Sequence, residues 1–242
     1  MRKRVRVVLM AGLVLGLVVP TVVADELATV EKKLTAAWKQ HKSVTVKLTM
    51  VTKMEQPGFA MDSKAEGTQE VLKKGDKILY RMDMATSAVQ KVGDQEMKSQ
   101  SKTTAISDGA FLYMLTETDG QKMAFKSKAD PQQAGDPTGT FKLLREHNQL
   151  KLLPEEETDG QKAYVIEALP KKAAGPQATR TVIYYSQEHG VLLKSVTYDA
   201  SGKPMSTMTC TDYKFDVTID PQRFVFKAPE GVQVIDQTAA QP

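Results

Sequence analysis

The fold is decided by the stretch Thr181-Val-Ile-Tyr-Tyr185, Val191-Leu-Leu-Lys-Ser-Val-Thr-Tyr198 and Met205–Val217, which predicts three consecutive strands. β-Branched and aromatic residues fill these runs, and polar clusters that contain glycine separate them, as is typical of a β-meander. Such a sheet needs a cover over one face. The cover is either the protein's own core or a bound molecule.

The first 24 residues have the composition of a secretory signal peptide. Four basic residues come first, and an unbroken apolar run, Val7–Val19, follows them. Val22-Val-Ala24 then has short residues at the positions that a signal peptidase recognises, so we predict cleavage after Ala24. The apolar run is shorter than the roughly 20 residues that a membrane-spanning helix needs. An uncleaved N-terminal anchor is the alternative.

Net charge gives no support for a nucleic-acid partner. The predicted signal peptide contributes four of the 33 basic residues and none of the 29 acidic ones, so residues 25–242 are neutral overall. A nucleic-acid interface would need a basic face. The length of residues 25–242 fits a single β-rich domain. The one cysteine, Cys210, excludes an intramolecular disulfide, and we expect it to be buried.

The chain after the signal peptide begins with a helix and a strand. Residues 25–42 carry apolar side chains at helical spacing, which are Leu27, Val30, Leu34 and Trp38. Trp38 is interpreted as a packing anchor. Residues 43–54 alternate instead, which predicts a strand with one wet face, its apolar side formed by Val44, Val46, Leu48 and Met50.

Hairpins and one helical insertion follow. Gly67–Lys73 pairs with Lys77–Ala85, and Thr103–Ile106 pairs with Ala110–Leu115 across Ser107-Asp-Gly109. Ser87–Lys102 is polar and is either another strand or mobile. Two Asp-Pro pairs in residues 130–137 predict a helix start, and we interpret Thr138–Leu150 as a lid with hinges at Gly135 and Gly139. The total is about nine to eleven strands.

Several motifs make the chain resemble the LolA/LolB superfamily of periplasmic lipoprotein carriers. An N-terminal Leu-rich helix precedes an alternating strand, and Asp108-Gly109 precedes the aromatic strand Ala110-Phe-Leu-Tyr113. A Leu-Leu helix lies in the middle of the chain, at Phe141-Lys-Leu-Leu144. The ending Phe224-Val-Phe-Lys-Ala-Pro-Glu-Gly-Val-Gln-Val-Ile235 is the most specific of these motifs, and the resemblance covers nearly all of residues 25–242.

The resemblance implies a mainly β fold with a helical lid (α+β), in which an open, incomplete antiparallel β-barrel is covered by the N-terminal helix and the mid-chain insertion. It implies a monomer that binds the acyl chains of lipoproteins or lipids and meets an inner- or outer-membrane partner protein. Carriers of this family hold the lid with an arginine near the end of the second strand. The corresponding basic residues here are Lys74 and Arg81, which we expect to form a polar latch.

Apolar residues on the predicted strands and lid are candidates for the wall of an acyl-binding cavity. They are Val46, Leu48, Met50, Leu79, Leu112, Met114, Met123, Phe125, Phe141 and Leu144. The chain has 12 methionines, and methionine adapts to irregular guests. Each of these residues, taken singly, is also compatible with an ordinary core.

Catalytic and metal-binding patterns are missing from the sequence. The three histidines, His41, His147 and His189, are scattered, and neither a Gly-x-Ser-x-Gly elbow nor a paired-cysteine metal site is found. We therefore predict no cofactor, no metal and no enzymatic activity. The predicted function is that of a periplasmic, non-enzymatic carrier. A lipid- or lipoprotein-sensing protein and a structural envelope protein of the same fold remain alternatives.

Overall fold

The computed structural model describes residues 20–129, 137–171 and 179–239. The elements in chain order are α1 (Pro20–Gln40), β1 (Ser43–Gln56), β2 (Phe59–Lys74), β3 (Lys77–Val92), β4 (Gln95–Ser107), β5 (Phe111–Thr118), β6 (Gln121–Lys128), α2 (Pro137–His147), β7 (Asn148–Thr158), β8 (Gln161–Pro170), β9 (Arg180–Ser186), β10 (Leu192–Tyr198), β11 (Pro204–Phe215), the 3-10 helix η2 (Pro221–Phe224) and β12 (Val234–Asp236).

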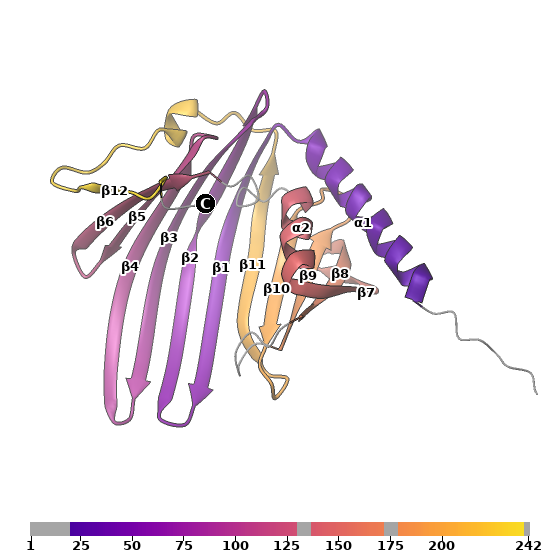
Figure 1. Ribbon diagram of the computed structural model, residues 1–242, viewed down its shortest axis with the longest axis horizontal. Coiled ribbons are helices and arrows are strands. Elements are labelled where there is room, and N and C mark those ends of the chain that lie inside the picture. Colours follow the sequence, from indigo (N-terminus) through magenta and orange to yellow (C-terminus); the bar gives the residue numbers. More distant parts are fainter. Residues whose placement is uncertain (1–19, 130–136, 172–178, 240–242) are drawn as a thin grey trace, which may run out of the picture.

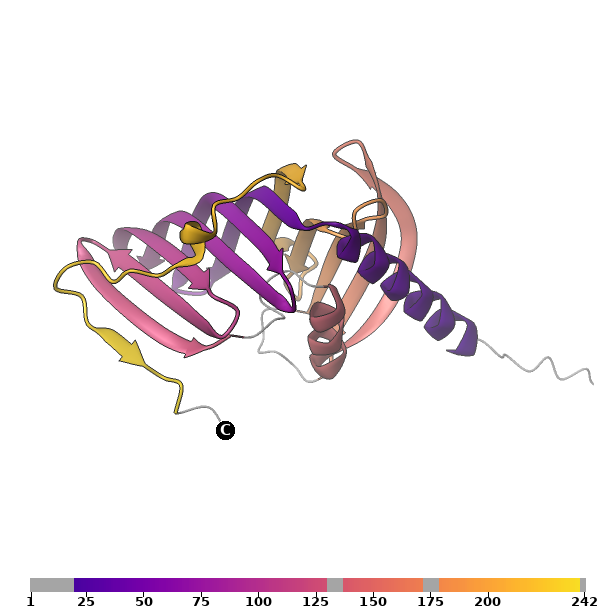
Figure 2. The same ribbon diagram turned by 90° about the horizontal axis from the view of Figure 1, so that it is seen from above.

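All strands belong to one sheet of 12, in the order β12-β6-β5-β4-β3-β2-β1-β11-β10-β9-β8-β7. Neighbours are antiparallel except for β12 and β6, which are parallel. The sheet is long and curved, and seen from above it forms an arch with α2 in its hollow (Figures 1 and 2). Because β7 and β12 are its two ends, the arch stays open. The predicted open half-barrel with a helical cover is confirmed.

The predicted strand count of nine to eleven was too low. Ser87–Lys102, which the sequence left open, forms the paired ends of β3 and β4 on either side of a turn at Gly93. Polar side chains on both faces hide the alternation of these ends, because each face is partly exposed there. The short β12, which begins within the ending Phe224–Ile235, was not among the predicted strands and pairs with β6.

Helix α1 packs through the predicted apolar stripe. Leu27, Val30, Leu34 and Trp38 are all buried, and Trp38 is a packing residue as expected. The helix ends at Gln40, two residues earlier than predicted, and residue 20 already belongs to it. Close to its C-terminal half, Gly190 has a φ of +67°, and a Cβ there would lie 2.1 Å from the carbonyl oxygen of Leu34. Glycine at this position therefore lets the β9–β10 turn approach the helix.

Helix α2 lies against α1 and the β7–β9 part of the sheet. Phe141 is buried in one cluster with Leu27, Val30 and Leu34 of α1, and Leu144 packs at its margin. Arg145 pairs with Glu31 of α1, and Lys171 donates to the carbonyl oxygen of Arg145 at 2.5 Å. The helix was predicted to run to Leu150, but it ends at His147, and residues 148–150 begin β7. The hinge predicted at Gly135 lies outside the described residues.

The C-terminal segment, residues 216–239, crosses the other side of the sheet. Figure 2 shows η2 on the outside of the arch, opposite α2. Phe224 is buried there with Ile219 and Leu79, and β12 then covers the edge of β6.

The predicted cleavage site, Ala24, lies within α1, and residues 1–19 are outside the described part of the chain. The buried residues described for α1 begin at Leu27, so cleavage after Ala24 would keep all of these described residues. None of the helices in the described residues is both long enough and apolar enough to span a membrane.

Candidate functional site

The strand register sorts side chains onto two faces, because cross-strand partners point to the same side of a sheet. Trp38 of α1 packs on the side that carries Val44, Val71 and Tyr80, which we name the concave face. Its next two rows across the sheet are Val46–Gln69–Met82–Ala105–Met114–Phe125 and Cys210–Leu48–Gly67–Met84–Thr103–Thr116–Met123.

A small recess lies on this face under the helices. It has a volume of about 130 Å³, and its walls include Trp38 of α1, Thr140 of α2, Val46 and Leu48 of β1, and Tyr185 of β9. Ligand pockets usually measure roughly 300–1,000 Å³. The recess therefore accommodates only part of a long ligand, and the remainder would lie on the sheet outside it.

The concave face opens beyond the recess. Along β1, Val46 and Leu48 are 6% and 4% exposed, whereas Met50 is 36% exposed. Met97, Met114 and Met123 are also exposed large apolar residues. A second hollow of about 210 Å³ lies nearer the β6 edge, where Leu112, Met114 and Phe125 meet Gln237 of the C-terminal segment.

Methionine is concentrated on this face. Met1 and Met10 belong to the predicted signal peptide, which leaves ten of the chain's 12 methionines. The register puts nine of these ten on the concave face, and Met205 lies at an irregularity in the pairing of β10 with β11. The nine concave-face methionines are Met50, Met54, Met61, Met82, Met84, Met97, Met114, Met123 and Met208.

The ionisable groups around the recess are held in their neutral forms. Burial raises the pKa of Tyr185, and it raises the pKa of Cys210 to about 11 against a smaller opposing effect of a hydrogen bond with Tyr213. Burial also raises the pKa of Tyr213 well above its ordinary value. At neutral pH the recess therefore has an uncharged wall, which suits an apolar guest and would disfavour a buried charge.

The predicted cavity residues divide into groups. Val46 and Leu48 line the recess; Leu112, Met114 and Phe125 line the second hollow. Phe141 and Leu144 belong to the contact between α2 and α1, although Phe141 also contacts Tyr185 with ring centroids 5.5 Å apart. Met50 and Met123 lie on the open part of the face.

Leu79 was assigned to the wrong face. It packs against Phe224 and Ile219 on the outside of the arch, while its neighbour Tyr80 points into the concave side. The run Ile78-Leu79-Tyr80 is apolar throughout because both faces are covered here, by the core within and by the C-terminal segment without. Alternation alone could not separate the two faces.

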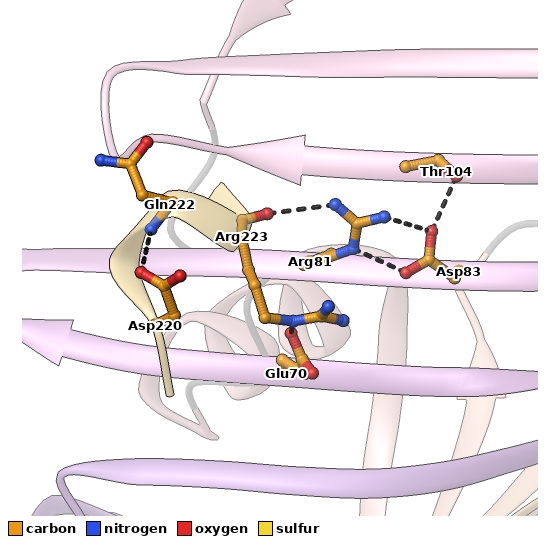
Figure 3. Close-up of polar contacts among 7 residues, drawn as sticks. All are labelled: Glu70, Arg81, Asp83, Thr104, Asp220, Gln222 and Arg223. Carbon is orange, nitrogen blue, oxygen red and sulfur yellow. Dashed lines mark hydrogen bonds and ion pairs between the residues drawn. The ribbon is translucent and has the colours of Figure 1, made fainter. Parts of the chain in front are cut away.

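The predicted latch was also misplaced. Arg81 lies on the outer face, where its guanidinium bonds both carboxylate oxygens of Asp83, at 2.6 and 2.9 Å, and the carbonyl oxygen of Arg223 at 3.1 Å (Figure 3). The register puts Lys74 on that face too, and it is exposed. Its neighbour Lys73 reaches the concave side and donates to the carbonyl oxygen of Trp38 at 2.5 Å.

The polar cluster of Figure 3 fastens the C-terminal segment to the sheet. Arg223 donates to Glu70 at 2.6 Å, and Thr104 donates to Asp83 at 2.7 Å. Burial alone would raise the pKa of Asp83, but the hydrogen bonds from Arg81 and Thr104 and the nearby guanidinium charges outweigh it and lower the pKa. Four charged residues of the cluster form two ion pairs, Arg81 with Asp83 and Arg223 with Glu70. These contacts explain the cluster as an attachment of the C-terminal segment.

Sequence reasoning missed several residues of the concave face, among them Tyr80, Met82, Met84 and Tyr185. Met82 and Met84 alternate with Arg81 and Asp83, a period-two pattern that was available in the sequence. Tyr185 was assigned to a strand, but nothing in the sequence indicates that its side chain meets residues of β1 and α2 at the recess. Among the described residues, no group of three or more His, Cys, Asp or Glu side chains is arranged to hold a metal ion.

Comparisons with known proteins bear mainly on the fold. A family model described as an uncharacterized protein matches residues 141–227, which is less than half of the chain. A comparison with the curated proteins finds no match. A solved structure of an uncharacterized conserved protein from Thermus thermophilus is similar over 87% of this chain and 99% of its own, with a TM-score of 0.53 and 9% identity.

Other similar structures have lower TM-scores. The complex of MucA and MucB from Pseudomonas aeruginosa is matched over 84% of this chain and 61% of that chain, at 16% identity and a TM-score of 0.44. A LolA superfamily protein from Nitrosomonas europaea is matched over 82% of this chain and 97% of its own, at 14% identity and a TM-score of 0.31. The likeness to the Thermus thermophilus protein, at 9% identity and a TM-score of 0.53, concerns the fold alone.

Proposed function

We propose that the concave face binds the acyl chains of a lipid or a lipidated protein, and that the protein is a non-enzymatic carrier in the periplasm. The observation that carries the proposal is the apolar path on this face. It starts in the uncharged recess at Val46 and Leu48, continues in the open over Met50, and reaches Met54 beyond one polar row, in which Thr52 lies opposite Ser63. From Val46 to Met54 the path is roughly 26 Å long at about 3.3 Å per residue.

The energetics suit reversible binding. Each sheltered CH₂ group of an acyl chain contributes about 0.8 kcal/mol. A chain enclosed over its full length would be held too tightly for ready release, since ordering costs offset only several kcal/mol. A path that encloses one end in a small recess and leaves the rest half-covered gives an intermediate affinity, as a carrier requires.

A second candidate is a structural envelope protein whose half-barrel is filled by its own side chains. The volume of the recess, about 130 Å³, favours this alternative because it is below the usual size of a ligand pocket. The two candidates differ in whether the purified protein carries lipid.

The first experiment is therefore extraction. The protein is purified from a bacterial envelope and extracted with organic solvent, and a fluorescent fatty acid is titrated into the delipidated sample. Near-stoichiometric acyl lipid, or saturable uptake of the probe, supports the carrier. If neither acyl lipid nor saturable uptake of the probe is found, the result supports the structural role. A pulldown that compares acylated with unacylated lipoproteins then distinguishes free lipid from lipidated protein as cargo, and a parallel capture from inner and outer membranes tests the proposed membrane partner.

The face that binds is tested by a pair of glutamate variants. Met50 and Val51 are neighbours on β1 with the same exposed fraction, 36%, but they point to opposite faces. Met50→Glu is expected to weaken binding of the fluorescent fatty acid by about tenfold or more, since a carboxylate would have to lose water against the acyl chain. Val51→Glu is expected to change the affinity less than about twofold.

Thermal unfolding serves as the control for this pair. Both positions are exposed enough to keep a carboxylate hydrated in the unliganded protein, so the two variants should unfold at similar temperatures. Equal loss of affinity in both variants, or unchanged affinity in Met50→Glu, would exclude the concave face as the binding surface.

A further inference from the structure

The apolar path has two parts that differ in stiffness. In the recess most side chains are branched or aromatic and largely buried, as with Val44, Val46, Trp38 and Tyr185, and one methionine, Met208, is among them. Branched and aromatic side chains have few rotamers, and close packing fixes them further. The recess therefore has a defined shape that a guest must match.

Toward the ends of the β1–β2 and β3–β4 hairpins, beyond the polar row of Thr52 and Ser63, methionines take the place of these side chains. Met54 and Met61 are direct cross-strand partners, and Met61 and Met97 flank Gln90 in the same row. Methionine is unbranched, has three rotatable bonds and fills irregular gaps. Since Met50 and Met97 are also 36% and 50% exposed, their side chains have room to change rotamer. This part of the path adapts to its guest.

Solvation fixes which end of an acyl chain meets which part. A carboxylate or other polar head group loses its hydration if it enters an uncharged recess, which costs several kcal/mol. The methyl end has no such cost. The chain would therefore lie with its methyl end in the rigid recess and its head-group half over the methionines.

We infer that the protein binds acyl chains of varied shape, accepting a cis double bond in the half near the head group and rejecting one near the methyl end. This inference rests on the proposed function, because it concerns the same site. Surfaces built from flexible methionines bind several partners by repacking, whereas a rigid apolar pocket discriminates by shape. The combination predicts selectivity that depends on where the chain is bent.

The test uses three fatty acids of equal length: a saturated chain, a chain with a cis bond near the carboxyl end, and a chain with a cis bond near the methyl end. Each displaces a fluorescent fatty acid from the full chain without its signal peptide. The first two are expected to bind within about threefold of each other, and the third about tenfold more weakly, the smallest effect typical of a misfit in an apolar pocket.

A variant with stiff side chains tests the role of the methionines. Met50→Ile, Met54→Ile, Met61→Ile and Met97→Ile are combined, which keeps the strands apolar and suited to a sheet. The isomer bent near the carboxyl end should then bind about tenfold more weakly relative to the saturated chain. Val51→Ile, on the other face, is the control and should leave all three affinities unchanged.

The outcomes separate this inference from the proposed function. If no fatty acid binds the unmodified protein, the proposed function itself fails. If fatty acids bind but the two bent isomers have equal or reversed affinities, acyl binding stands and the inference is overturned. The comparison of the two bent isomers on the unmodified protein tests the inference even if the variant with four substitutions does not fold. If the quadruple variant folds and the affinity of the isomer bent near the carboxyl end is unchanged relative to that of the saturated chain, the role of the methionines is overturned.

Discussion

Replacing Gly67 with valine is expected to cost more than about 3 kcal/mol of folding stability, which places it among the most disruptive single substitutions. Gly67 lies inside β2, between Leu48 of β1 and Met84 of β3. A Cβ at this position would be 1.9 Å from the backbone carbonyl oxygen of Asp83. Because that oxygen belongs to the backbone of β3, a rotamer change cannot relieve the contact, and the two strands must separate.

The effect is measured by thermal unfolding followed by circular dichroism. A loss of about 3 kcal/mol corresponds to roughly 6–12 °C in a protein of this size. The control is Gly58→Ala in the β1–β2 turn, where φ is +77° and a Cβ would meet nothing within 4 Å. It should cost only the strain of a left-handed residue, about 1–2 kcal/mol. Similar unfolding temperatures for the two variants would show that β2 and β3 do not approach closely at Gly67.

The Gly67 contact also bears on the candidate site. Glycine inside a strand marks a tight bend, and bends of this kind produce the curvature of half-barrels. Gly67 lies in the same concave row as Leu48 and Met84. The close approach of β2 and β3 therefore occurs where the buried recess gives way to the open methionines. Because Gly67 has no side chain, β2 and β3 can approach closely there, and this approach contributes to the curvature that forms the hollow.

The sequence predicted the elements well where one face is buried and the other wet. Alternation from Val44 to Met50 specifies β1, and the spacing of Leu27 to Trp38 specifies the buried stripe of α1. Prediction from the sequence failed where the two faces of a strand have the same polarity. Ser87–Lys102 is polar on both sides, and Ile78-Leu79-Tyr80 is apolar on both, so neither stretch carries a period-two signal.

The site was less predictable than the fold because it depends on contacts between distant parts of the chain. Val46 and Leu48 were correctly expected on one strand face, but their neighbours Tyr185 and Thr140 come from elements more than 90 residues away. The contact between Arg81 and the carbonyl oxygen of Arg223 forms only because the C-terminal segment crosses the outside of the sheet. Local patterns contain no information about either meeting.

The C-terminal segment is the subject of the second large prediction. Phe224 is 1% exposed and packs against Leu79 and Ile219 on the outer face of the sheet. Phe224→Ala removes a fully buried ring and leaves a cavity, a change that costs about 3–5 kcal/mol. The Arg223–Glu70 pair has side chains 46% and 17% exposed, and exposed ion pairs contribute only about 0–1 kcal/mol. Burial of Phe224 therefore dominates the attachment of this segment.

Loss of the Phe224 anchor is expected to release the segment locally while the rest of the sheet stays folded. Limited proteolysis should cut residues 216–239 at least tenfold faster than in the unmodified protein, because about 1.4 kcal/mol changes an open population tenfold. Release also uncovers the edge of β6, which β12 pairs in the intact protein, and an uncovered edge favours association between chains. Val225→Ala is the matched control, since Val225 is adjacent and 48% exposed. If Phe224→Ala resists the protease as Val225→Ala does, the segment is held by its polar contacts rather than by the buried ring.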